Sequence, residues 1–136
     1  MPRIKHIAMT TKDPAKAAAF YKDAFGLREI RRSSNGAVFL TDGYINVAIL
    51  NYKTEKDADV GAHGPNFEGL HHIGFEVENL DEACEKLESA QGKRLTAKEG
   101  LAMEMEPGGH RNFEMKWAGP LGEVIDISHS GWDLGS

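Results

Sequence analysis

Four polar side chains interrupt apolar, strand-like segments of this sequence. His6 and His72 lie in short runs rich in Ile and Phe, and Asn46 and Asp126 each interrupt a later apolar run. A polar group buried in such a strand must find a partner. Two imidazoles, a carboxylate and an amide oxygen form a plausible ligand set for a divalent cation, and they contain the two-His-one-carboxylate triad of non-haem iron sites. The sequence therefore predicts a metal site at His6, Asn46, His72 and Asp126.

The histidines occupy matching places in an internal repeat. A constant offset of 66 residues relates the two halves of the chain, and the pairs at this spacing include His6 with His72, Ile7 with Ile73, Asp13 with Asn79 and Gly26 with Gly92. Each half contains a strand, a helix N-cap, an apolar helix face and a glycine where a helix would end. The same pattern places Asn46 and Asp126 at equivalent positions of the two halves. If the halves pack around a common cleft, all four side chains point to its centre.

The pattern predicts an α+β fold of two βαβββ units that form an open mixed sheet enclosing a cleft. We expect a single domain over 1–136, with repeats at about 1–52 and 69–130 and a linker at 53–68. The predicted strands are 3–10, 27–33, 36–41 and 44–50 in the first unit and 70–77, 93–98, 111–118 and 123–129 in the second. Neither unit buries enough surface alone, so the units must pair within the chain or across a homodimer.

Composition excludes several classes of protein. The 136 residues hold 16 Lys and Arg against 21 Asp and Glu, and the net charge of −5 does not support a nucleic-acid partner. The single cysteine, Cys84, cannot form an internal disulfide. The sequence contains no run of 18 apolar residues, and its first residues lack the apolar region of a signal peptide. We therefore expect a cytoplasmic protein with a small-molecule substrate and no membrane association.

Several motifs resemble those of the vicinal-oxygen-chelate superfamily, which includes glyoxalase I, methylmalonyl-CoA epimerase, extradiol ring-cleavage dioxygenases, and fosfomycin and bleomycin resistance proteins. The matching segments are KHIA at 5–8, DP at 13–14, FY at 20–21, LHHIGF at 70–75 and GEVIDI at 122–127. The resemblance implies metal ligands on the first and last strands of each unit, and these positions carry His6, Asn46, His72 and Asp126. The family commonly has Glu at the last position and Glu or Gln at the second.

The resemblance implies a metal-dependent lyase or isomerase of glyoxalase or epimerase type, with Zn, Ni, Co, Mn or Fe as the divalent cation. The metal would act as a Lewis acid that stabilises an enediolate, and Asp126, the one carboxylate in the set, is the candidate catalytic base. His71, next to His72, is expected to face the other side of the strand.

Two alternatives remain open from the sequence. An Fe(II) extradiol-type dioxygenase would use His6, His72 and Asp126, but ring-cleaving relatives often have twice this length. A non-catalytic protein that binds a small molecule such as an antibiotic needs no metal, and the weaker ligand Asn46 is compatible with it.

Overall fold

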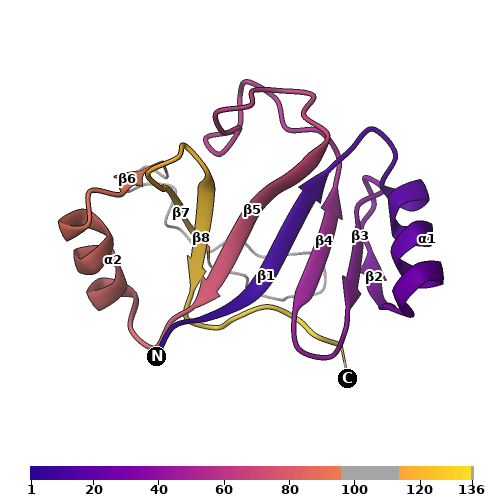
Figure 1. The fold of residues 1–136 in the computed structure, drawn as a ribbon, viewed down its shortest axis with the longest axis horizontal. Helices are drawn as coiled ribbons and strands as arrows, with labels where there is room; N and C mark the ends of the chain where they lie inside the picture. The colour runs from indigo at the N-terminus through magenta and orange to yellow at the C-terminus, as the bar shows by residue number, and fades with distance from the viewer. Residues whose placement is uncertain (96–113, 136) are drawn as a thin grey trace.

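The computed structural model describes residues 1–95 and 114–135, which form one eight-stranded mixed sheet with two helices (Figure 1). The strand order is β2-β3-β4-β1-β5-β8-β7-β6. The first half contains β1 (Arg3–Thr10), α1 (Pro14–Phe25), β2 (Arg28–Arg32), β3 (Val38–Thr41) and β4 (Asn46–Leu50). The second half contains β5 (Gly69–Glu76), α2 (Leu80–Ser89), β6 (Lys93–Arg94), β7 (Met115–Ala118) and β8 (Val124–Ser128). The predicted α+β class and open sheet are confirmed; residues 96–98 and 111–113 of two predicted strands lie outside the described residues.

The two units join within one chain, through β1 and β5 at the centre of the sheet. These strands are antiparallel, with Ile7 opposite Ile73. On its other side each central strand pairs in parallel with the last strand of its own unit, β1 with β4 and β5 with β8. His6 and His72 therefore lie on the two strands that form the seam between the repeats.

Local sequence signals explain where both helices begin. The Asp13 side chain accepts a hydrogen bond from the Lys16 N–H at 3.2 Å, and the Asn79 side chain accepts one from the Glu82 N–H at 3.0 Å. Such caps satisfy backbone donors that the first helical turn leaves unpaired.

The two helices end differently, although the repeat predicts a glycine stop for both. Gly26 ends α1 with a left-handed φ of 70°, as predicted. In the second unit Gln91 takes the positive φ, at 69°, instead of Gly92. Gly92 is needed for close approach, because a Cβ there would lie 3.1 Å from the Leu87 carbonyl oxygen.

Both helices cover the same face of the sheet, one near each end (Figure 1). Ala18 of α1 packs with Leu40 and Ile49, and Leu87 of α2 packs against a buried cluster that includes Trp117 and Ile127. Since side chains alternate along a strand, His6, His72 and Asp126 point to the opposite face.

The segment after β8 runs across the sheet toward the first unit (Figure 1). The Leu134 carbonyl oxygen at its far end accepts a hydrogen bond from Arg28 of β2. No helix in the described part of the chain has the length and apolar character needed to cross a membrane.

Candidate metal centre

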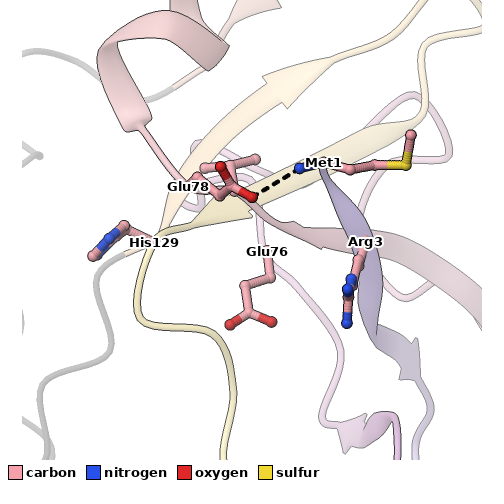
Figure 2. Close-up of a pocket in the computed structure, with 6 residues that line it drawn as sticks. Met1, Arg3, Glu76, Glu78 and His129 are labelled. Carbon is pink, nitrogen blue, oxygen red and sulfur yellow. Dashed lines mark hydrogen bonds and ion pairs between the residues drawn. The ribbon is translucent and has the colours of Figure 1, made fainter.

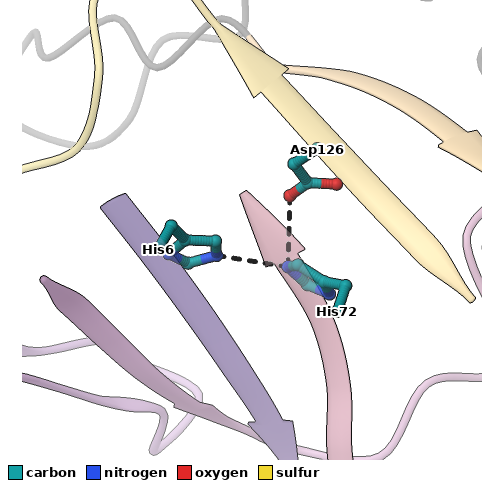
Figure 3. Close-up of side chains that lie close together, drawn as sticks. All are labelled: His6, His72 and Asp126. Carbon is teal, nitrogen blue, oxygen red and sulfur yellow. Dashed lines mark hydrogen bonds and ion pairs between the residues drawn. The ribbon is translucent and has the colours of Figure 1, made fainter. Parts of the chain in front are cut away.

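His6, His72 and Asp126 meet on three adjacent strands, β1, β5 and β8 (Figure 3). His6 Nε2 lies 3.2 Å from His72 Nε2, and His72 Nε2 lies 3.1 Å from Asp126 Oδ2. One ligand atom from each residue falls within 4.8 Å of the others. The three residues are 4%, 6% and 0% exposed, so water cannot readily solvate them.

Asn46 fixes the ring of His6. Its Oδ1 lies 2.8 Å from His6 Nδ1, and its Nδ2 donates to the Asp133 carbonyl oxygen at 2.8 Å. An amide oxygen only accepts hydrogen bonds, so these partners assign the proton of His6 to Nδ1. The bare Nε2 of His6 then faces His72.

His71 fixes His72 in the same way, although the sequence predicts that it faces elsewhere. His71 Nε2 donates to the Val60 carbonyl oxygen at 3.1 Å, so its Nδ1 is the acceptor for His72 Nδ1, 2.7 Å away. His72 Nδ1 therefore carries a proton, and its Nε2 faces His6 and Asp126. The predicted orientation of His71 is wrong because it assumed a regular strand, whereas the β1–β5 ladder has an irregularity beside His72.

These assignments bring three acceptors together. A proton on His72 Nε2 would satisfy its contact with Asp126 but would leave His6 Nε2 without a donor within this trio. A single cation would satisfy all three atoms at once. Ligands about 2.0–2.2 Å from one ion lie roughly 2.8–3.6 Å apart in octahedral or tetrahedral geometry, and the His6–His72 and His72–Asp126 distances fall in that range.

The protonation state of His6 also suits a ligand. Burial, followed by the charge of His72, lowers the pKa of His6 to about 4. At neutral pH the imidazole is therefore uncharged, the state in which histidine binds metal. The residues present thus fit a divalent cation.

The strand register corrects the predicted equivalence of Asn46 and Asp126. Asn46 lies opposite His6 in the β1–β4 ladder, whereas Asp126 lies opposite Gly74 in the β5–β8 ladder. The first-unit position that matches Asp126 is therefore Ala48, which offers no ligand atom. Alternation has a period of two, so a shift of two residues leaves a side chain on the same face and the sequence pattern cannot detect it.

Lys116 forms the largest charged contact at the site and was not predicted. Its Nζ lies 3.0 Å from both Asp126 oxygens, 3.2 Å from Glu114 Oε2 and 3.4 Å from Asp59 Oδ2. Lys116 alternates with buried Met115 and Trp117, so the rule that identified Asp126 also identifies it. Asp59 lies in the loop between β4 and β5, where no pattern marks it.

The charged groups around Lys116 shift the pKa values of Asp126 and Glu114 in opposite directions. Burial alone would raise the pKa of Asp126, but contacts with His72 and Lys116 outweigh it and hold that pKa well below its usual range. Burial, reinforced by the charge of Asp126, raises the pKa of Glu114. Burial would lower the pKa of Lys116, but the surrounding carboxylates raise it. Asp126 and Lys116 therefore stay ionised at neutral pH.

A separate surface pocket lies at the end of β1 and β5 (Figure 2). It has a volume of about 360 Å³ and is lined by Met1, Arg3, Glu76, Val77, Glu78 and His129. The Met1 ammonium pairs with Glu78 at 2.9 Å. None of the three clustered residues is among the described residues that line it, so this pocket is not the candidate metal centre.

The family model of the Glyoxalase/Bleomycin resistance protein/Dioxygenase superfamily matches residues 3–114. The chain therefore belongs to this superfamily.

Individual relatives carry different activities. Glyoxalase I of Saccharomyces cerevisiae is 29% identical over 140 residues, covering 79% of this chain and 42% of the yeast protein. A methylmalonyl-CoA epimerase, solved in complex with methylmalonyl-CoA and NH4+, superposes with a TM-score of 0.65 and 20% identity over 93% of each chain. The 2,3-dioxygenase LapB from Pseudomonas sp. KL28 gives a TM-score of 0.60 and 18% identity over 98% of this chain and 42% of its own. The two structural matches establish the fold, and the chain spans less than half the length of the yeast protein and of LapB.

Proposed function

We propose that this chain is a metal-dependent lyase or isomerase of glyoxalase or epimerase type, acting on a small substrate with two neighbouring oxygens. The observation that supports this most strongly is the convergence of one ligand atom each from His6, His72 and Asp126 within 4.8 Å. Membership of the superfamily makes such chemistry reasonable. The alignment with yeast glyoxalase I favours a lyase, and the epimerase fold favours an isomerase.

His6, His72 and Asp126 would hold the cation, which is Zn, Ni, Co, Mn or Fe. When bound, the cation would supply Lewis-acid polarisation of the substrate oxygens. Asn46 acts on the ligand set indirectly, because its Oδ1 accepts from His6 Nδ1. Ala48, at the position that matches Asp126, offers no ligand atom, which favours direct binding of substrate oxygens to the cation.

Glu114 suits the role of base better than Asp126, the residue that the sequence favours. Lys116 contacts both oxygens of Asp126 and keeps that carboxylate ionised and weakly basic. A general base works best with a pKa near the working pH, and burial raises the pKa of Glu114 in that direction. We assign Glu114 the removal of a proton from the substrate carbon beside the carbonyl, and Asp126 the role of ligand.

Metal content and proton exchange test this function together. The protein, purified without chelator, is reloaded with Ni, Zn, Co or Mn and incubated in D2O with small α-oxygenated carbonyl compounds and with methylmalonyl-CoA. We expect one ion per chain and metal-dependent deuterium incorporation beside the carbonyl, detected by NMR. Glu114→Gln should abolish the exchange but keep the metal. Glu78→Gln, which changes an exposed carboxylate paired with the Met1 ammonium, should change neither. Absence of stoichiometric metal binding would refute the proposal.

An Fe(II) dioxygenase is the second candidate. With Ala48 at the matched position, the described ligand set reduces to two histidines and one carboxylate, the composition of non-haem iron oxygenases. Oxygen consumption is measured with catechols after anaerobic iron loading. Uptake would favour this candidate over the first, and no uptake would remove it.

We further propose that the protein acts as a cytoplasmic homodimer. Each chain would carry its own complete ligand set, because His6, His72 and Asp126 come from adjacent strands of one sheet.

A further inference from the structure

Trp132, in the segment after β8, lies directly against the candidate metal centre. Its ring stacks on the His6 imidazole with a centroid distance of 4.8 Å and an interplanar angle of 1°. Its Nε1 donates a hydrogen bond to Glu114 Oε1 at 2.7 Å. One indole therefore contacts both a proposed metal ligand and the proposed base.

The sheet provides a place for this indole at Gly74. A Cβ at this position would lie 2.7 Å from two ring carbons of Trp132 and 2.8 Å from His6 Cβ. Gly74 is opposite His6 in one ladder and opposite Asp126 in the other. The missing side chain thus allows the indole to lie over the seam between the two units.

The segment that carries Trp132 is held at both ends. Before it, Ser128 Oγ accepts from the Gly131 N–H at 3.1 Å. After it, the Asp133 and Leu134 carbonyl oxygens accept from Asn46 and Arg28 at 2.8 and 3.2 Å. These contacts anchor the segment that carries the indole to both halves of the sheet.

We propose that Trp132 is a positioning residue that holds the His6 ring and the Glu114 carboxylate in their working orientations. Asn46 fixes one edge of the imidazole and Trp132 fixes its face, so that Nε2 points at His72 and Asp126. The inference rests on the proposed metal-dependent function. Residues that orient metal ligands typically change metal affinity by about 10–100-fold when they are removed.

Three variants separate the two contacts of the indole. Trp132→Ala removes both, Trp132→Phe keeps a ring on His6 but removes the hydrogen bond to Glu114, and Leu134→Ala is the control on the same segment. Zn²⁺ affinity is measured by calorimetry, and the visible absorption bands of the Co²⁺-loaded protein report ligand geometry. Circular dichroism shows whether each variant is folded.

We expect Trp132→Ala to bind Zn²⁺ about 10–100-fold more weakly and to shift the Co²⁺ bands. Trp132→Phe should keep the parental affinity and bands but slow the proton exchange, because Glu114 has lost the hydrogen bond from the indole. Leu134→Ala should match the parent protein. Equal affinity and spectra in the parent and Trp132→Ala would overturn this inference alone, whereas a parent protein that binds no metal would overturn the proposed function with it. If Trp132→Ala does not fold, the Trp132→Phe result decides: exchange at the parent rate would overturn the role toward Glu114.

Discussion

The His6 imidazole is enclosed by an amide at its Nδ1 edge, an indole on its face and a second imidazole at Nε2. The amide assigns the proton to Nδ1, while burial and the charge of His72 keep the pKa of the ring low, so that the ring stays neutral. His72 is held by His71 in a similar way, so two further polar side chains orient the two histidines. Such contacts are expected where two ring nitrogens must point at one atom.

The lowered pKa of His6 predicts how the metal-free protein responds to acid. Above pH 6.5, His6 is neutral in both the folded and unfolded states. As pH falls from 6.5 towards the folded pKa of about 4, the unfolded chain takes up a proton that the folded protein refuses, so the free energy of unfolding decreases. The loss should total about 3 kcal/mol and level off at lower pH.

Urea unfolding in EDTA between pH 4.5 and 7.5 measures this effect. His6→Gln should flatten the dependence on pH. Burial also lowers the pKa of His71, but by less than that of His6, so His71→Gln should flatten the dependence less. An unchanged slope in His6→Gln would show that His6 is not the group responsible.

Lys116 predicts opposite effects on folding and on metal binding. Lys116→Met leaves three carboxylates without their shared ammonium, and loss of one partner from a buried ion pair costs about 3–5 kcal/mol in the metal-free protein. The same change removes a positive charge 3.0 Å from the Asp126 ligand, so metal affinity should rise by about tenfold or more.

Unfolding with and without Zn²⁺ gives both quantities. Lys53→Met is the matched control, since Lys53 pairs with Asp59 at 3.1 Å. It should lower stability without tightening metal binding. A Lys116→Met protein with parental metal affinity would contradict this account of the cluster.

At this scale the sequence identifies His6, His72, Asp126 and Asn46 because they are polar residues in apolar strands. It misses what lies around them. Asp59 comes from a loop and Trp132 from a tail, and only tertiary packing brings either to the sheet. Lys116 is also a polar residue in an apolar strand, between buried Met115 and Trp117, so the same rule applies to it.

At the scale of elements, the β1–β5 seam depends on Gly74. Gly74→Ala places a methyl group into His6 and Trp132, and such overpacking typically costs about 1–3 kcal/mol. We expect lower stability and weaker metal binding together. In a protein that also carries Trp132→Ala, Gly74→Ala should cost less stability, because the indole it clashes with is gone. A double-mutant cycle by urea unfolding measures this. If the free energies lost by the two substitutions simply add, the added methyl group does not clash with Trp132.

The elements were predictable where local signals are strong. The caps at Asp13 and Asn79, the glycine stop at Gly26 and both first strands follow from residue type and spacing. The register between β1 and β4 does not, because it is set by pairing across sequence-distant strands, and this is why Ala48 rather than Asn46 matches Asp126. The positive φ after α2 lies at Gln91 rather than at Gly92, which shows that an internal repeat need not preserve each turn.

At the scale of the whole molecule, the units pair within one chain, so the proposed dimerisation should not depend on the metal site. Leu70 and Ile73 on the central strand β5 are 67% and 36% exposed, and we expect them to contact a second copy. Light scattering should give twice the chain mass of 14.9 kDa. Leu70→Glu with Ile73→Glu should halve it without loss of metal, and metal loss on separation would show that the ligands are shared between chains.

The central claim is that His6, His72 and Asp126 bind one divalent cation. An anomalous difference map from a Zn²⁺-soaked crystal, collected at the zinc edge, tests it most directly. The account predicts one strong peak per chain in contact with Nε2 of His6, Nε2 of His72 and the Asp126 carboxylate, and no such peak in His72→Ala crystals. A peak at other residues, or none in the parent protein at saturating zinc, would contradict it.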